Sequence, residues 1–211
     1  MPFSIISVNT GKSRKIKLNS GRFMVSAIIK KPVQGPIYAG RDGLFGDESA
    51  DRRLHGGWDK AVCAYSQDHY PAWENFFCRT LSPGSFGENF TIKGLVEETV
   101  YLGDIYRIGM AEFQVSQPRV PCQKINRIFE RNDVVRKIRS TGKSGFYLRV
   151  LKPGNVLSGD PLVLLSRPDD PISIQKSNRL WRGKEIPPGF LESILGKDFV
   201  SSAWKKDLKK L

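Results

Sequence analysis

The sequence has few of the features that assign a protein to a class at once. It contains only three cysteines, Cys63, Cys78 and Cys122. An odd number at irregular spacing argues against a disulfide framework and is typical of a reducing cytoplasm. No apolar run approaches the length of a membrane span, and no charged region precedes the short apolar stretch near the N-terminus. We therefore predict a cytoplasmic protein without a signal peptide or membrane contact.

Histidine is as scarce, with His55 and His69 alone. Neither the cysteines nor the histidines have the spacing of a structural zinc site. The glycine patterns of P-loops and dinucleotide-binding folds are also absent. A thiol hydrolase would need a histidine to accept the proton of Cys122, and His55 is the one attractive candidate.

Acidic residues are missing from the start of the chain. None occurs before Asp42, and the net charge of the whole protein is +13. Such a balance favours anionic partners, whether nucleic acid, anionic lipid or a phosphorylated small molecule, although scattered lysines are often only a solvated surface. The basic stretches lack the interleaved aromatics that stack on bases, so nucleic acid is disfavoured, and a basic RNA-binding barrel remains an alternative.

What the sequence does contain is a series of short alternating or β-rich runs. Turn residues separate them, which predicts a mainly β fold with helices, built on a closed or nearly closed antiparallel sheet. The runs are residues 3–8, 23–29, 61–65, 90–92, 99–102, 105–108, 112–116, 146–151 and 162–165. Residues 152–155 are among the predicted turns.

Helices interrupt and follow the predicted sheet. One is capped by Asp68 and holds Pro71 in its first turn; a second follows Cys122, and a third begins at Asp133 and ends near Gly142. Short helices dominate after the proline-bracketed stretch at residues 167–171. We predict a barrel domain over residues 1–168 and a small helical domain over residues 169–211, which is too small for a core of its own and must pack on the barrel or a partner.

Cys122 lies where an alternating run ends and the predicted helix begins. Pro118 and Pro121 keep the chain extended before it. Unpaired N–H groups at a helix start, together with Arg119 and Lys124, favour the thiolate over the thiol. The alternative is a small buried hydrophobe, which is what most lone cysteines are.

Three further segments carry candidate binding residues. Gly56 and Gly57 allow positive φ and close approach to an anion, with His55 and Lys60 on either side. Glu88 and Asn89 follow a second glycine-bearing loop and could hold the edge of a heterocycle. Arg149 alternates with apolar residues on a predicted strand and could clamp a phosphate or simply face solvent. The alternative is that these glycines only form turns and that the charged residues beside them only face solvent, with no ligand bound.

Taken together, these loops resemble the MOSC domain, in particular its YiiM-like branch. The resemblance rests on LHGGWDKAV (54–62), PGSFGEN (83–89) and QPRVPC (117–122), with GLFGD (43–47) and TGKSGFY (141–147) in support, and it covers nearly the whole chain. It implies a MOSC-type β-barrel with a small three-helix C-terminal appendage. It also implies the molybdenum cofactor, a metal-bound molybdopterin, rather than pyridoxal phosphate.

The resemblance further implies roles for the candidate residues. Cys122 becomes the metal ligand, and reduction of N-hydroxylated bases or related N-oxygenated compounds, with electrons from a separate reductase, becomes the expected activity. The cofactor would carry the redox chemistry while the protein binds and orients it. We expect His55, Gly56, Gly57, Lys60, Arg119 and Arg149 to bind the cofactor phosphate or orient substrate, Glu88 and Asn89 to hold the pterin edge, and His55 to supply a proton. The alternative within the family is a carrier of sulfur or cofactor that turns over no substrate.

Overall fold

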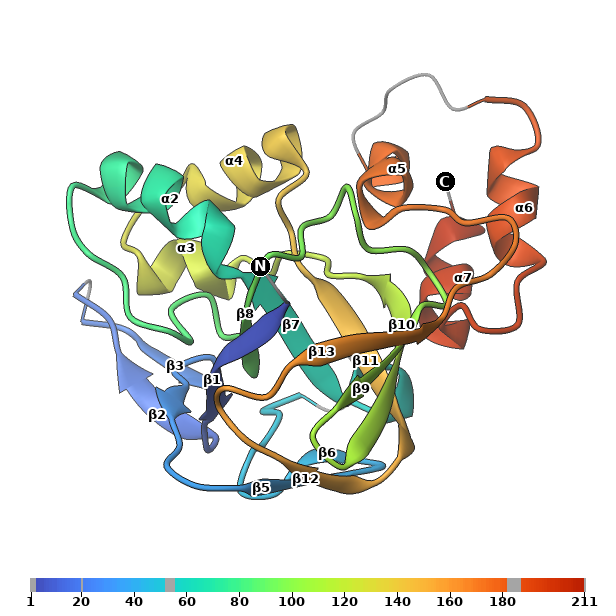
Figure 1. Ribbon diagram of the computed structural model, residues 1–211. Helices are drawn as coiled ribbons and strands as arrows, with labels where there is room; N and C mark the ends of the chain where they lie inside the picture. The colour runs from blue at the N-terminus through green and yellow to red at the C-terminus, as the bar shows by residue number, and fades with distance from the viewer. Residues whose placement is uncertain (1–2, 20, 52–55, 182–186, 211) are drawn as a thin grey trace.

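The structure is a computed structural model that describes residues 3–19, 21–51, 56–181 and 187–210. Its centre is an eight-stranded sheet in the order β13-β9-β10-β11-β7-β8-β1-β4 (Figure 1). The strands of this sheet are β1 (Ser4–Thr10), β4 (Lys31–Pro32), β7 (Val62–Ser66), β8 (Phe90–Lys93), β9 (Ile105–Ile108), β10 (Ala111–Pro118), β11 (Phe146–Lys152) and β13 (Leu162–Ser166).

The sheet closes on itself between β1 and the start of β13. Ile5 N donates to Asp160 O and Leu162 N to Phe3 O, each over 2.9 Å. The predicted barrel is therefore confirmed, with one correction to its topology: β7 and β8 pair in parallel. A parallel pair needs a long crossover, and helix α2 (Tyr70–Phe77) lies within it.

Two smaller sheets extend the barrel. One has the order β12-β5-β6, from Gly154–Val156, Ile37–Gly40 and Gly43–Leu44, and lies at the bottom of Figure 1. The other is the hairpin of β2 (Arg14–Lys17) and β3 (Phe23–Ser26). Two predictions were wrong here: the turn expected at residues 152–155 includes the start of β12, and residues 99–102 form no strand beyond one bridge between Tyr101 and Ser173.

Helices α2, α3 (Lys124–Ile128) and α4 (Val134–Thr141) cover one side of the barrel, at the upper left of Figure 1. Their aromatic and aliphatic faces form a second hydrophobic cluster with Tyr65 and Phe86. Every residue of β7 is buried, because the barrel core lies on one face and this cluster on the other. The prediction that Asp68 caps α2 was wrong. It lies inside the short helix η2 (Gln67–His69), and its carboxylate accepts from Gly94 N over 2.7 Å.

The last part of the chain forms α5 (Ile174–Ser177), η3 (Asn178–Trp181), α6 (Phe190–Leu195) and α7 (Ser202–Leu208). These helices pack on the barrel, at the upper right of Figure 1, and their buried residues Trp204 and Leu208 belong to the same hydrophobic core as the strands. A core shared in this way explains how so short a segment folds, and the division at residue 168 stays a prediction. No helix in the described part of the chain is long and apolar enough to cross a membrane.

Candidate functional site

A cavity of about 600 Å³ opens between the barrel and the β12-β5-β6 sheet, within the size range of small-molecule sites. Loops far apart in sequence meet there. The predicted site residues that line it are Gly56, Gly57, Lys60, Asn89, Arg119 and Cys122. The structure therefore brings all three of the singled-out loops to one place.

Cys122 is half-buried beside this cavity. The two prolines lead the chain out of β10 as expected, and Cys122 O accepts from Ile125 N over 3.0 Å at the start of α3. That helix has only five residues, so its dipole is weak and contributes less at the sulfur than the sequence argument assumed. The cavity lining also holds charged side chains of both signs, among them Arg119, Lys60 and Asp47.

Arg119 provides a buried positive charge in the cavity wall. Its guanidinium donates to Phe86 O, and its backbone N–H donates to Gly145 O over 3.0 Å. Burial lowers the pKa of Arg119, but the nearby Cys63, Tyr147 and Glu88 more than offset it, so the net pKa lies above the usual value. Arg119 remains charged and is held in a fixed position.

Lys60 ends the short helix η1 (Trp58–Lys60), which follows the glycine pair. Gly57 has a φ of +90°, a conformation that other residues rarely adopt. Burial lowers the pKa of Lys60, while Asp207 and Asp59 oppose that shift. His55, predicted as a proton donor and phosphate ligand next to this pair, lies outside the described residues.

Asn89 lines the cavity, but its amide is occupied by the protein itself. Its Oδ1 accepts from Cys63 N over 3.0 Å, and its Nδ2 donates to Asp47 Oδ2 over 2.7 Å. The same amide also donates to Asn9 O. Asn89 thus fixes two walls of the cavity relative to each other.

Glu88 does not line the cavity. Its side chain is fully buried and accepts hydrogen bonds from Gly84 N, Phe86 N, the Thr91 hydroxyl and the Tyr70 hydroxyl. The carboxylate holds the glycine-bearing turn in shape. From the sequence we expected Glu88 to hold the pterin edge. The structure instead buries its carboxylate outside the cavity lining.

Arg149 also lies outside the cavity lining. It forms a 2.8 Å ion pair with Asp59, donates to Phe199 O over 2.8 Å, and stacks on Trp58 with its Cζ 4.8 Å from the ring centroid. Because Trp58 and Asp59 precede Lys60 in η1, Arg149 holds the helix that carries Lys60. It acts on the site through these neighbours and not by clamping a phosphate.

Several lining residues were missed by the sequence reasoning. Lys30 and Asp47 form an ion pair with both side chains largely buried, and Asp47 also accepts from Gly11 N over 2.8 Å. Cys63 and Tyr147, paired between β7 and β11, lie next to each other in the wall. Burial raises the pKa of the Cys63 thiol, although Arg119 opposes it, so this sulfur is protonated at neutral pH. The GLFGD segment, which contains Asp47, was the sequence feature that could have identified Asp47 as a lining residue.

The donor set limits which metal group the cavity can hold. The described residues contain no group of three or more histidine, cysteine or carboxylate side chains able to hold a metal ion. A metal here would have one half-buried thiol, that of Cys122, and would need to bring its other ligands with it. A cofactor that carries its own sulfur ligands and a phosphate fits a cavity whose lining holds the Cys122 thiol together with Arg119, Lys60 and Lys30.

Comparison with known proteins gives consistent matches. The model of the MOSC domain matches residues 51–163. Uncharacterized protein YflK of Bacillus subtilis (strain 168) is 41% identical over 208 residues, which cover 99% of this chain and 94% of YflK. A protein named Reductase from Gibberella moniliformis is 35% identical over 194 residues, covering 88% of this chain but 33% of that protein. The crystal structure of YiiM from Geobacillus stearothermophilus has a TM-score of 0.84 and 37% identity, covering 99% of this chain and 98% of YiiM.

Proposed function

Since the chain belongs to the MOSC domain family, in its YiiM-like branch, we propose that it binds the molybdenum cofactor in the cavity and reduces N-hydroxylated bases or related N-oxygenated compounds. A separate reductase supplies the electrons. The observation that carries this proposal is the half-buried thiol of Cys122 in a cavity of about 600 Å³. Five cationic side chains, Lys30, Arg41, Lys60, Arg119 and Lys124, line this cavity together with four acidic ones, Asp42, Asp47, Glu48 and Asp51.

The residues divide into those that bind the cofactor and those that hold the binders in place. Cys122 supplies the protein's sulfur ligand to molybdenum. Arg119 and Lys60, with the backbone N–H groups of Gly56 and Gly57, hold the phosphate, because cations and a loop containing the positive-φ residue Gly57 form an anion site. Asn89, Glu88 and Arg149 fix the walls through the hydrogen bonds described above.

The reaction is a two-electron reduction. The N–O bond of R–NHOH breaks, two electrons and two protons enter, and R–NH₂ and water leave. When bound, the molybdenum cofactor supplies this redox chemistry, while the protein orients the substrate and controls protons. The role of His55 as proton donor rests on the sequence alone.

The name of the relative called Reductase supports a reductive role. The match covers 33% of that protein, so the region similar to this chain is part of a much longer chain there. We propose that the present protein receives its electrons from a second protein instead.

The test is expression in a host that makes the cofactor, followed by metal analysis of the purified protein. We expect molybdenum in wild type and its loss in Cys122→Ser. Cys78→Ser is the matched control, because Cys78 is exposed and lies outside the cavity lining. Full loading of Cys122→Ser would remove this sulfur from the metal site.

A second assay separates the enzyme from a carrier. Loaded protein is mixed with an N-hydroxylated purine and a chemically reduced viologen dye as electron donor. Formation of the amino purine supports reduction. Full molybdenum content without product would indicate the carrier function.

A further inference from the structure

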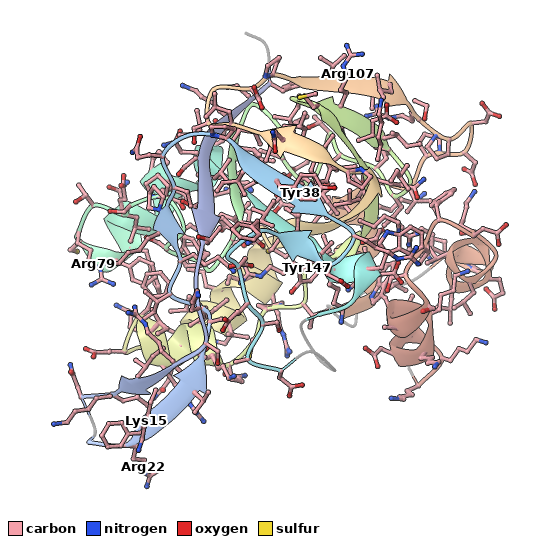
Figure 2. All side chains as sticks on the ribbon, turned by 90° about the horizontal axis from the view of Figure 1, so that it is seen from below. Lys15, Arg22, Tyr38, Arg79, Arg107 and Tyr147 are labelled. Carbon is pink, nitrogen blue, oxygen red and sulfur yellow. The ribbon has the colours of Figure 1, made fainter. Side chains whose placement is uncertain are left out.

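Two exposed aromatic rings lie at the rim of the cavity. Phe45 is 77% exposed and Tyr38 is 53% exposed, yet both are among the lining residues. Tyr38 and Tyr147 are both labelled near the centre of Figure 2, and Tyr147 also lines the cavity. Exposing apolar ring surface to water is unfavourable, and two such rings together at a cavity mouth are typical of a ligand-binding surface.

The two residues lie opposite each other at the end of the β5–β6 pair. Ala39 of β5 pairs with Leu44 of β6, and both side chains are buried in the barrel core. Side chains alternate along a strand, so Tyr38 points to the face opposite Ala39, while Phe45 is the turn residue directly after β6. Phe45 N donates to Tyr38 O over 2.8 Å, which makes the two residues cross-strand neighbours.

The turn and loop that carry Phe45 are fixed on both sides. Gly43 has a φ of +123°, and a Cβ there would lie 2.8 Å from Ala61 O, so the turn packs directly against the backbone after Lys60. Beyond Phe45, Asp47 is held by Lys30, Asn89 and Gly11 N. The rings are therefore presented on a rigid support, which reduces the entropy lost when a ligand binds.

We propose that Phe45 and Tyr38 form a stacking platform for the planar base of the substrate, and this proposal rests on the proposed function. A flat heterocycle offers the π face that such rings bind, whereas a small aliphatic N-hydroxy compound does not. The platform makes the protein selective for N-hydroxylated aromatic bases, with the N–OH group directed inward.

The exposure of the lining residues separates the platform from the cofactor site. Arg119, Asn89 and Cys63 are buried in the wall, while Phe45 and Tyr38 are at the solvent edge. A cofactor gripped by the buried cations occupies the inner part of the cavity. The outer rings then face the second molecule, which is the substrate.

The variant to make is Phe45→Ala, which removes an exposed ring and should not affect folding. Stacking of a base on an aromatic side chain is worth roughly 1–3 kcal/mol, so we expect the dissociation constant of an N-hydroxylated purine, measured by calorimetry on purified protein, to rise roughly 5- to 150-fold. Phe45→Trp should restore binding. Phe23→Ala is the matched control, because Phe23 is 56% exposed on β3 but lies outside the cavity lining.

Further measurements distinguish lost stacking on the substrate base from lost binding of the N–OH group or of the cofactor. Binding of acetohydroxamic acid, which has no aromatic ring, should not change in Phe45→Ala. The molybdenum content of this variant should equal that of wild type; a loss would mean that the pterin occupies the platform and would overturn the proposal. Equal purine affinity in wild type and Phe45→Ala would also overturn it. Weaker purine binding by Phe45→Ala supports the platform even if wild type reduces nothing, so the proposed function can fail separately.

Discussion

Glu88→Gln tests whether this carboxylate is structural. In the native protein, one carboxylate oxygen accepts from Gly84 N, Tyr70 and Thr91, and the other accepts from Phe86 N. An amide keeps only one acceptor oxygen. In its least harmful orientation the new NH₂ group faces the N–H of Phe86, which leaves a buried donor without a partner.

The cost follows from that lost partner. A buried unsatisfied donor costs about 1–3 kcal/mol, and the remaining bonds lose the charge of the acceptor, so we expect a total of roughly 2–3 kcal/mol. For a chain of 211 residues this lowers the melting temperature by about 4–12 °C. Differential scanning calorimetry measures the shift. Glu192→Gln, at an exposed position on α6, serves as the control and should stay within about 0.5 kcal/mol of wild type.

The same variant is then assayed for metal. We expect folded Glu88→Gln to keep its molybdenum, because Glu88 lies beneath the turn and outside the cavity lining. An unchanged melting temperature combined with loss of molybdenum would refute this reasoning, since it would show that Glu88 contacts the cofactor.

Two further predictions concern the cysteines and η1. Iodoacetamide at pH 8 should modify exposed Cys78 first and half-buried Cys122 next. It should not modify Cys63 in the native protein, because this thiol is buried and its pKa is raised. Detection of labelled Cys63 by mass spectrometry of protein that was kept native would contradict this prediction. Arg149→Met should destabilise the protein by roughly 1–3 kcal/mol and lower its molybdenum content, because the ion pair with Asp59 that holds η1 is lost. If the urea unfolding curve and the metal content were both unchanged, Arg149 would not hold η1 in place.

The barrel was predictable because alternation of apolar and polar residues follows directly from one buried strand face. Strands such as β9 and β10 show it clearly. The parallel pairing of β7 with β8 was not predictable, since β7 is buried on both faces and shows no alternation. The short strand β12 begins at a glycine after Pro153, and these two residues favoured the prediction of a turn.

The meeting of three loops at one cavity was predictable from the resemblance to the MOSC domain, because each loop alone could be a plain turn. The sequence did not show which of these residues line the cavity and which only support the ones that do. Glu88 and Arg149 have ordinary ligand chemistry in sequence, but their partners Tyr70 and Asp59 come from distant segments that only the fold brings near. Lys30 was missed for the same reason, because its pairing with Asp47 depends on the folded loop.

The measurement that tests the central claim most directly is molybdenum K-edge X-ray absorption on loaded wild type and Cys122→Ser. We predict that molybdenum in wild type has one sulfur ligand more than any residual molybdenum in the variant, because the half-buried thiol in the cavity belongs to the metal. Identical sulfur coordination in both proteins, or no molybdenum in either, would contradict it.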